Sequence, residues 1–137
     1  MKKLFLIALF NFTFLIFNCN AQCDTIASVC AKHIASPFIS DGQQYRALLL
    51  SDQTAEFHTT FYGGATYRIA AVTGLKDGNL IFSVYDEERN LLYSNQDFKN
   101  APYWDFKINS TLDVIIEANL GGTTTSGCAV MLIGFKQ

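Results

Sequence analysis

Few side chains in this chain of 137 residues could supply a nucleophile together with a base. His33 lies on the apolar side of a short amphipathic segment, where a hydrogen-bonded structural histidine is expected. His58 takes an outward position on a predicted strand, where contact with solvent accounts for it. No serine occupies a Gly-x-Ser-x-Gly turn. The sequence therefore favours a protein that is not an enzyme, with a small secreted hydrolase of unrecognised site as an alternative.

Acidic residues crowd the turn from Asp86 to Asn90, and a second turn has the sequence Asp77-Gly78-Asn79. Calcium takes about six to eight oxygen ligands, and dedicated loops supply them from regularly spaced positions. Neither turn has that spacing, and no cysteine–histidine pattern suits a structural zinc site. We therefore expect solvated turn residues here, with neither a metal nor a cofactor.

Four residues are candidate binding residues because the predicted strands and turns place them at the surface. They are Tyr62, at the tip of a predicted hairpin, and Tyr103, Asp105 and Lys107, on the outer side of a later strand. Lys107 is also expected to pair with Asp113 across a tight turn. Tyr85 and Tyr93 are predicted to face outward as well. Because exposed tyrosines can stack on sugar rings, a carbohydrate-binding module is a second alternative.

The N-terminus has the features of a secretory signal peptide rather than of folded structure. Two lysines precede an apolar run from Leu4 to Phe17, and small residues follow at Cys19 and Ala21. This pattern predicts cleavage after Ala21, so residues 1–21 form the signal peptide and the product is periplasmic or secreted. Lipidation of Cys19 is disfavoured because the two residues before it suit that processing poorly. The apolar run is shorter than the roughly 20 residues of a transmembrane helix.

Cleavage removes Lys2 and Lys3 and changes the formal net charge from −2 to −4. No run of lysine or arginine follows, so neither nucleic acid nor an anionic membrane surface is expected as a partner. No second long apolar segment follows either, which predicts no integral membrane segment in the mature chain. The expected partner is an unidentified protein or glycan of the cell envelope.

Three of the four cysteines remain after cleavage, and export permits disulfides. Cys23 and Cys30 are seven residues apart in a predicted helix, so about 10 Å separates them along its axis. That exceeds the roughly 7 Å limit between the Cα atoms of a disulfide, so Cys128 is the partner of one of them. The pairing Cys23–Cys128 is favoured, with Cys30 as a buried free thiol, and Cys30–Cys128 is the alternative.

One short amphipathic helix is predicted over about residues 24–35. Asp24 is a suitable N-cap, and Pro37 marks the end. The apolar side of this helix holds residues at helical spacing: Ile26, Val29, Cys30, His33 and Ile34.

After Ser40 the apolar and polar residues alternate in short runs, which indicates strands. The predicted strands are 45–50, two hairpin arms at 55–61 and 67–71, then 80–86, 91–94, 103–108, 112–118 and 128–135. The hairpin turns at Gly63-Gly64, and burial of both apolar sets selects a three-residue loop with Phe61 opposite Tyr67. Short strands separated by turns predict a mainly β fold, an antiparallel jelly-roll-like β-sandwich with one short N-terminal helix, as one domain over residues 22–137.

The order of three motifs resembles a known family. Phe61-x-x-Gly64-x-x-Tyr67-Arg68-Ile69 is followed by Leu80-x-Phe82-x-Val84-Tyr85-Asp86 and then by a late apolar hairpin. Over about Thr60 to Lys136 this order resembles the bacterial pre-peptidase C-terminal domain, a small β-sandwich of secreted proteins. Ser110-Thr111-Leu112-Asp113 replaces the Gly-x-Tyr that usually begins the late strand. The resemblance implies an exported, non-catalytic binding or accessory module, and it brings no catalytic residue.

Overall fold

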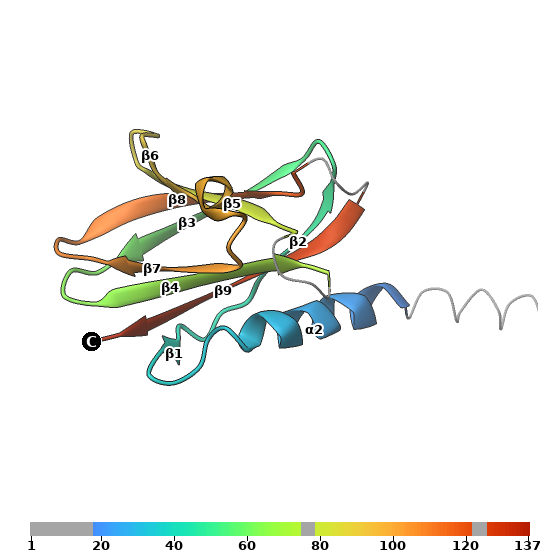
Figure 1. Ribbon diagram of the computed structural model, residues 1–137, viewed down its shortest axis with the longest axis horizontal. Helices are drawn as coiled ribbons and strands as arrows, with labels where there is room; N and C mark the ends of the chain where they lie inside the picture. The colour runs from blue at the N-terminus through green and yellow to red at the C-terminus, as the bar shows by residue number, and fades with distance from the viewer. Residues whose placement is uncertain (1–17, 75–78, 122–125) are drawn as a thin grey trace, which may run out of the picture.

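The computed structural model describes residues 18–74, 79–121 and 126–137, which form two β-sheets packed face to face with one helix outside them (Figure 1). The helix is α2 (Asn18–Ala31), and a 3-10 turn, η1 (Asn95–Phe98), lies between β6 and β7. The strands are β1 (Ile39–Ser40), β2 (Tyr45–Leu50), β3 (Thr54–Phe61), β4 (Thr66–Thr73), β5 (Ile81–Asp86), β6 (Leu91–Ser94), β7 (Tyr103–Lys107), β8 (Leu112–Asn119) and β9 (Ser126–Lys136).

All strand pairs are antiparallel. In sheet A, the long strand β9 pairs with β4 on one side and with both β1 and β2 on the other, and β7 pairs with the far side of β4. Sheet B has the order β3-β8-β5-β6. The predicted mainly β class, with two antiparallel sheets and one helix, is confirmed, whereas the jelly-roll connectivity stays a prediction.

The main core lies between the two sheets and holds most of the inward residues that alternation predicted, together with Tyr93, which was predicted to face outward. Phe61, Phe82 and Ile116 are among its fully buried side chains. Burying one such side chain contributes on the order of 1.5–3 kcal/mol. Since side chains alternate between the two faces of a strand, the face that carries the apolar residues gains this free energy when it packs toward the core.

A second, smaller apolar layer lies between α2 and the outer face of sheet A (Figure 1). Ile26, Ala27 and Cys30 of the helix are buried there. They pack against outward residues of β4 and β9: Ala70, Val72, Cys128, Val130 and Leu132. The Cys30 thiol donates to the carbonyl oxygens of Ala70 and Val130, at 3.3 and 3.7 Å. Central residues of these strands are thus covered on both faces.

The helix spans Asn18–Ala31 rather than 24–35. Asp24 is therefore an interior residue of the helix and not its N-cap. The residues before it, from Asn18 to Cys23, include no proline or glycine, so nothing in them interrupts the helix. The helix ends six residues before Pro37. Residues 1–17, which hold most of the predicted signal peptide, lie outside the described residues, so cleavage stays a prediction. No helix within the described part of the chain is long and apolar enough to cross a membrane.

The predicted hairpin between β3 and β4 is wrong, because the two strands belong to different sheets. Phe61 lies opposite Leu112 of β8, and Tyr67 lies opposite Phe106 and Phe135. The rings of Phe61 and Tyr67 nevertheless stack across the core, with centroids 4.4 Å apart. Both apolar sets are buried, as the register argument required, but by facing sheets rather than by neighbouring strands.

The prediction for the turn between β7 and β8 is wrong for the same reason, because these two strands also belong to different sheets. Lys107 lies opposite Thr66 in sheet A, and Asp113 lies opposite Thr60 in sheet B. The Thr60 hydroxyl donates to the Asp113 carboxylate, so the predicted Lys107–Asp113 pair is wrong. Alternation identifies the buried side of a strand, but it does not identify the neighbouring strand.

Candidate binding site

Tyr62 lies in the connection between β3 and β4, at the end of the sandwich that also carries the β7–β8 connection (Figure 1). Its side chain is 64% exposed, as predicted. The backbone beneath it is held in place, because the N–H of Tyr62 donates to the Tyr67 hydroxyl at 3.1 Å and the N–H of Gly63 donates to Thr111 Oγ1 at 3.0 Å. An exposed ring on a fixed backbone loses little freedom on binding, which suits an interface anchor.

Gly63 allows the two connections to approach closely. A Cβ at this position would lie 2.8 Å from the carbonyl oxygen of Asn109, closer than real Cβ contacts. The N–H of the next residue, Gly64, donates to the carbonyl oxygen of Ile108 at 2.8 Å. The two connections therefore form one platform beneath Tyr62.

A groove of about 620 Å³ opens beside Tyr62, where residues of both sheets meet. Its lining is aromatic and polar and includes Asp41, Gln43, Tyr45, Phe61, Tyr67 and Phe135. The Tyr45 hydroxyl donates to the Asp41 carboxylate at 3.3 Å. Burial, and then the charge of Asp41, raises the pKa of Tyr45 above its ordinary value. The groove offers rings for apolar contact and a carboxylate that can accept hydrogen bonds.

The other three predicted binding residues share the outer face of β7. Tyr103, Asp105 and Lys107 are all exposed, while Trp104 and Phe106 point to the core between them. Tyr62 lies in a different connection. The four predicted residues therefore come from two elements, strand β7 and the connection between β3 and β4.

Arg68 of β4 organises the outer face of β7, although it is not among the binding residues predicted from the sequence. Its Nε and Nη2 donate to the two carboxylate oxygens of Asp105 at 2.6 and 2.9 Å, and its Nη1 donates to the carbonyl oxygen of His33 at 3.1 Å. The guanidinium lies over the rings of Phe38 and Tyr103, 4.2 and 4.5 Å from their centroids. The hydrogen bond with Asp105 raises the pKa of Arg68 above its ordinary value. The sequence did contain a signal for this residue, because Arg68 is a charged residue within an otherwise apolar predicted strand.

An aromatic cluster closes the side of the sandwich between β6 and β7. Trp104 packs against Phe98 and Tyr93, with ring centroids 4.4 and 5.1 Å apart. Tyr93 was predicted to face outward, but it is buried. Its hydroxyl has no hydrogen-bond partner within the described residues. Burial, and then the charge of Asp97, raises the pKa of Tyr93 to about 12.

The outer face of sheet B carries a small charge network. Arg89 donates to Glu56 and to Glu117, both at 3.0 Å, and His58 Nε2 lies 2.6 Å from Glu56. The hydrogen bonds from Arg89, and then from His58, lower the pKa of Glu56. These side chains are largely exposed, and such pairs contribute little to stability. The outward position predicted for His58 is confirmed.

The acidic turn after β5 is held by its own hydrogen bonds. Asp86 accepts from the backbone N–H and the side-chain amide of Asn90, at 2.8 and 2.9 Å, and these bonds lower the pKa of Asp86. Asp77 and Gly78, in the other acidic turn, lie outside the described residues. Across the part of the chain that is described, no three His, Cys, Asp or Glu side chains gather as metal ligands would.

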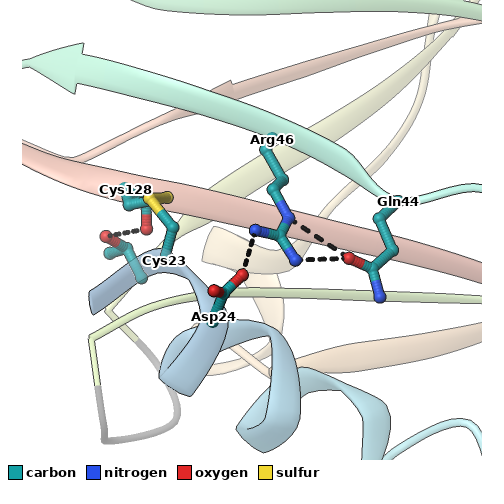
Figure 2. Close-up of a disulfide and its surroundings, with 6 residues drawn as sticks. Cys23, Asp24, Gln44, Arg46 and Cys128 are labelled. Carbon is teal, nitrogen blue, oxygen red and sulfur yellow. Dashed lines mark hydrogen bonds and ion pairs between the residues drawn. A yellow bond between two sulfur atoms is a disulfide. The ribbon is translucent and has the colours of Figure 1, made fainter. Parts of the chain in front are cut away.

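The disulfide joins Cys23 of α2 to Cys128 of β9, with 5.6 Å between the Cα atoms, so the favoured pairing is confirmed (Figure 2). Cys30 is buried and is not part of this disulfide. Next to the disulfide, Arg46 of β2 donates to the Asp24 carboxylate at 2.6 Å and also to the side chain of Gln44 (Figure 2). The helix is thus attached to sheet A covalently and by an ion pair.

The two facing antiparallel sheets place the chain among the β-sandwich proteins, and seven chains of solved structures match it. One is Aeromonas hydrophila PliG, a periplasmic lysozyme inhibitor of g-type lysozyme. The TM-score is 0.55 at 11% sequence identity, and the match covers 74% of this chain and 90% of PliG. At this identity the similarity shows the fold alone. No protein-family model and no curated protein matches the sequence, so the resemblance to the pre-peptidase C-terminal domain stays a prediction.

Proposed function

We propose that this chain is an exported, non-catalytic binding protein that holds a protein of the cell envelope at the groove beside Tyr62. One observation carries the proposal: an exposed tyrosine on a fixed backbone stands at the rim of a groove lined with aromatic rings. Tyrosine is enriched among the residues that dominate binding energy at protein interfaces.

Two further observations support export and a protein partner. The Cys23–Cys128 disulfide is of a kind that persists in oxidising compartments. PliG, which shares the fold, is a periplasmic protein that inhibits another protein. A glycan partner is the alternative, because rings and a carboxylate also suit sugars.

The test places a photo-cross-linking amino acid, p-benzoylphenylalanine, at position 62 in the full chain, expressed in cells that export it. The matched control carries it at position 48, because Leu48 is similarly exposed (68%) and lies on β2, outside the groove lining. We expect a covalent adduct with one envelope protein from position 62 and not from position 48. An adduct with a glycan would favour the carbohydrate-binding alternative. Equal adducts from both positions, or none from position 62, would contradict the proposal.

A purified g-type lysozyme is the first partner to test directly by titration calorimetry. Loss of a central anchor typically costs about 2 kcal/mol or more, which is about thirtyfold in affinity. Binding that Tyr62→Ala weakens by this factor supports the groove and this partner together. Absence of binding removes lysozyme as the partner, and the cross-linking experiment then decides the proposal.

A further inference from the structure

Strand β7 is an edge of sheet A, because within the described residues it pairs with β4 alone. The hydrogen bonds at its two ends show which of its residues bond to β4. Pro102, just before the strand, accepts from the N–H of Ala71 at 2.9 Å, and Ile108, just after it, donates to Ala65 at 3.0 Å. In an antiparallel pair, hydrogen-bonded and non-bonded residues alternate. The even-numbered residues of β7 therefore bond to β4.

The odd-numbered residues consequently direct their backbone N–H and C=O groups to the free edge. They are Tyr103, Asp105 and Lys107, the three residues that the sequence selected on this strand. The close side-chain contact between Arg68 and Asp105 agrees with this assignment, because non-bonded pairs bring side chains nearer. Three successive outward residues form a template for an added strand.

The surroundings of this edge suit apolar side chains. Trp104 and Phe106, which point inward from β7, stay partly exposed, and Phe98 beside them is 46% exposed. A hollow of about 490 Å³ lies along residues 101–105 and includes Trp104 in its lining. At the other end of the strand, Lys107 presents an exposed positive charge, whereas Asp105 is already neutralised by Arg68.

The opposite edge of sheet A is less available. The N–H of Leu50 in β2 donates to Gln53 Oε1 at 2.9 Å, and its carbonyl oxygen accepts from the N–H of Gln53 at 3.1 Å. Both backbone groups that Leu50 would offer to another strand are therefore occupied. Because bonded and non-bonded residues alternate, Arg46 and Leu48 are the other two β2 residues that direct backbone groups away from β9. The side chain of Arg46 is bonded to Asp24.

Sheet B has two edge strands, β6 and β3. Strand β6 has four residues and its pairing with β5 is irregular. Strand β3 carries Glu56 and His58, which bond to each other, and Glu56 also bonds to Arg89. Charged side chains of this kind disfavour the addition of a strand.

We propose that the β7 edge binds an extended segment of a protein partner, which adds to sheet A as a further strand. Backbone hydrogen bonds to Tyr103, Asp105 and Lys107 would supply affinity in this mode, and alternate side chains would supply specificity. The segment carries apolar residues at the positions that face Phe98 and Trp104. It carries a carboxylate opposite Lys107. The hollow along residues 101–105 and the groove beside Tyr62 share no lining residue, and this proposal does not depend on the function proposed for the groove.

The probe is a phage-displayed library of ten-residue segments, selected on the full-length protein and then synthesised with a fluorescent label. Fluorescence anisotropy measures binding to the wild type, to Lys107→Pro and to Leu48→Pro. A proline on an edge strand removes an outward N–H without breaking the ladder, and Leu48→Pro does the same on β2. We expect Lys107→Pro to weaken binding by about tenfold or more, from the lost hydrogen bond and the lost charge. Leu48→Pro should leave binding unchanged.

Two measurements keep the test decisive if a proline variant fails to fold. N-methylation of the alternate segment residues that face β7 should abolish binding to the wild type, whereas N-methylation of the other residues should preserve it. The bound segment should slow hydrogen exchange at the amides of residues 103, 105 and 107. Recovery of no segment, equal binding to Lys107→Pro, or protection of other amides would overturn the proposal. So would a wild type that dimerises through β7, which would make a second copy the occupant.

Discussion

The two edges of sheet A are built differently. At the β2 edge, Gln53 occupies the outward backbone groups of Leu50, and Arg46 reaches across to Asp24 of the helix. The disulfide between α2 and β9 lies beside that ion pair (Figure 2). At the β7 edge, by contrast, three residues direct their backbone groups outward, away from β4, and no strand of the described chain pairs with them there. The neighbouring cover consists of aromatic side chains.

This difference indicates that the β2 edge of sheet A mainly stabilises the fold, whereas the β7 edge is available for binding. Covalent and polar links concentrate where the helix must be attached to the sheet. The β7 side is held by ring packing and by the Arg68–Asp105 pair, both of which leave the strand edge accessible. Four predictions test whether the two sides are as distinct as this comparison implies.

The largest effect is expected from removing the disulfide with Cys23→Ala and Cys128→Ala together. The bond closes a sequence separation of 105 residues, and loss of such a link typically costs about 2–5 kcal/mol. Urea denaturation should show this fall in the free energy of unfolding. Hydrogen exchange should accelerate more in α2 than in β7, because amides that open only by global unfolding also exchange faster when the whole protein is less stable. Unchanged stability, or equal acceleration on both sides, would remove the distinction.

Tyr93→Phe should instead stabilise the protein, by about 1 kcal/mol at neutral pH, because it removes a buried hydroxyl that has no partner among the described residues. The gain should grow at high pH. The pKa of Tyr93 rises from its ordinary 10.0 to about 12 in the folded protein, so wild-type stability falls as the pH rises from about 10 through 12. Phenylalanine does not ionise and escapes this loss.

Urea denaturation at pH 7 and pH 11 checks the Tyr93 prediction. Tyr62→Phe serves as the control, because the Tyr62 ring is exposed and its hydroxyl can reach solvent. A Tyr93→Phe variant that is less stable than the wild type at pH 7 would show that the hydroxyl has a partner.

Gln53→Ala should cost about 0.5–1.5 kcal/mol, since it removes the side-chain acceptor of the Leu50 N–H. Exchange of the Leu50 amide should accelerate, while the Leu49 amide should keep its rate. The control is Gln96→Ala, an exposed glutamine of η1 beside the other edge. An unchanged rate at Leu50 would mean that the side chain does not protect this edge.

The smallest effect is expected for Asp24→Asn, which weakens the ion pair with Arg46. Its two side chains are 35% and 68% exposed, so the cost should be below about 1 kcal/mol and should shrink at high salt. Asp52→Asn, in the exposed turn after β2, is the matched control. A larger or salt-independent loss would show that the pair contributes more to attaching the helix than its exposure implies.

The sequence predicted most of the strands and the inward sides that form the core, because alternation reports burial directly. Helical rise excluded a bond between Cys23 and Cys30 and so assigned Cys128 to one of them. The position of Cys23 at the start of the predicted helix then favoured the pairing that the structure shows. The sequence misplaced Tyr93, since the strand that carries it is short and its pairing is irregular. It chose three residues on the strand with the open edge without indicating that the edge was open.

The amino-acid sequence by itself determined which side of most strands is buried and which cysteines can pair. Only the tertiary structure decided which strands are neighbours. Backbone hydrogen bonds between strands are chemically alike for nearly all residues, so local sequence does not specify whether Phe61 meets Tyr67 along a hairpin or across a core. The arrangement of neighbouring strands also determines three surface features: the capped edge at Leu50, the open edge at β7 and the groove beside Tyr62. Each of them is made by residues from segments that only folding brings together.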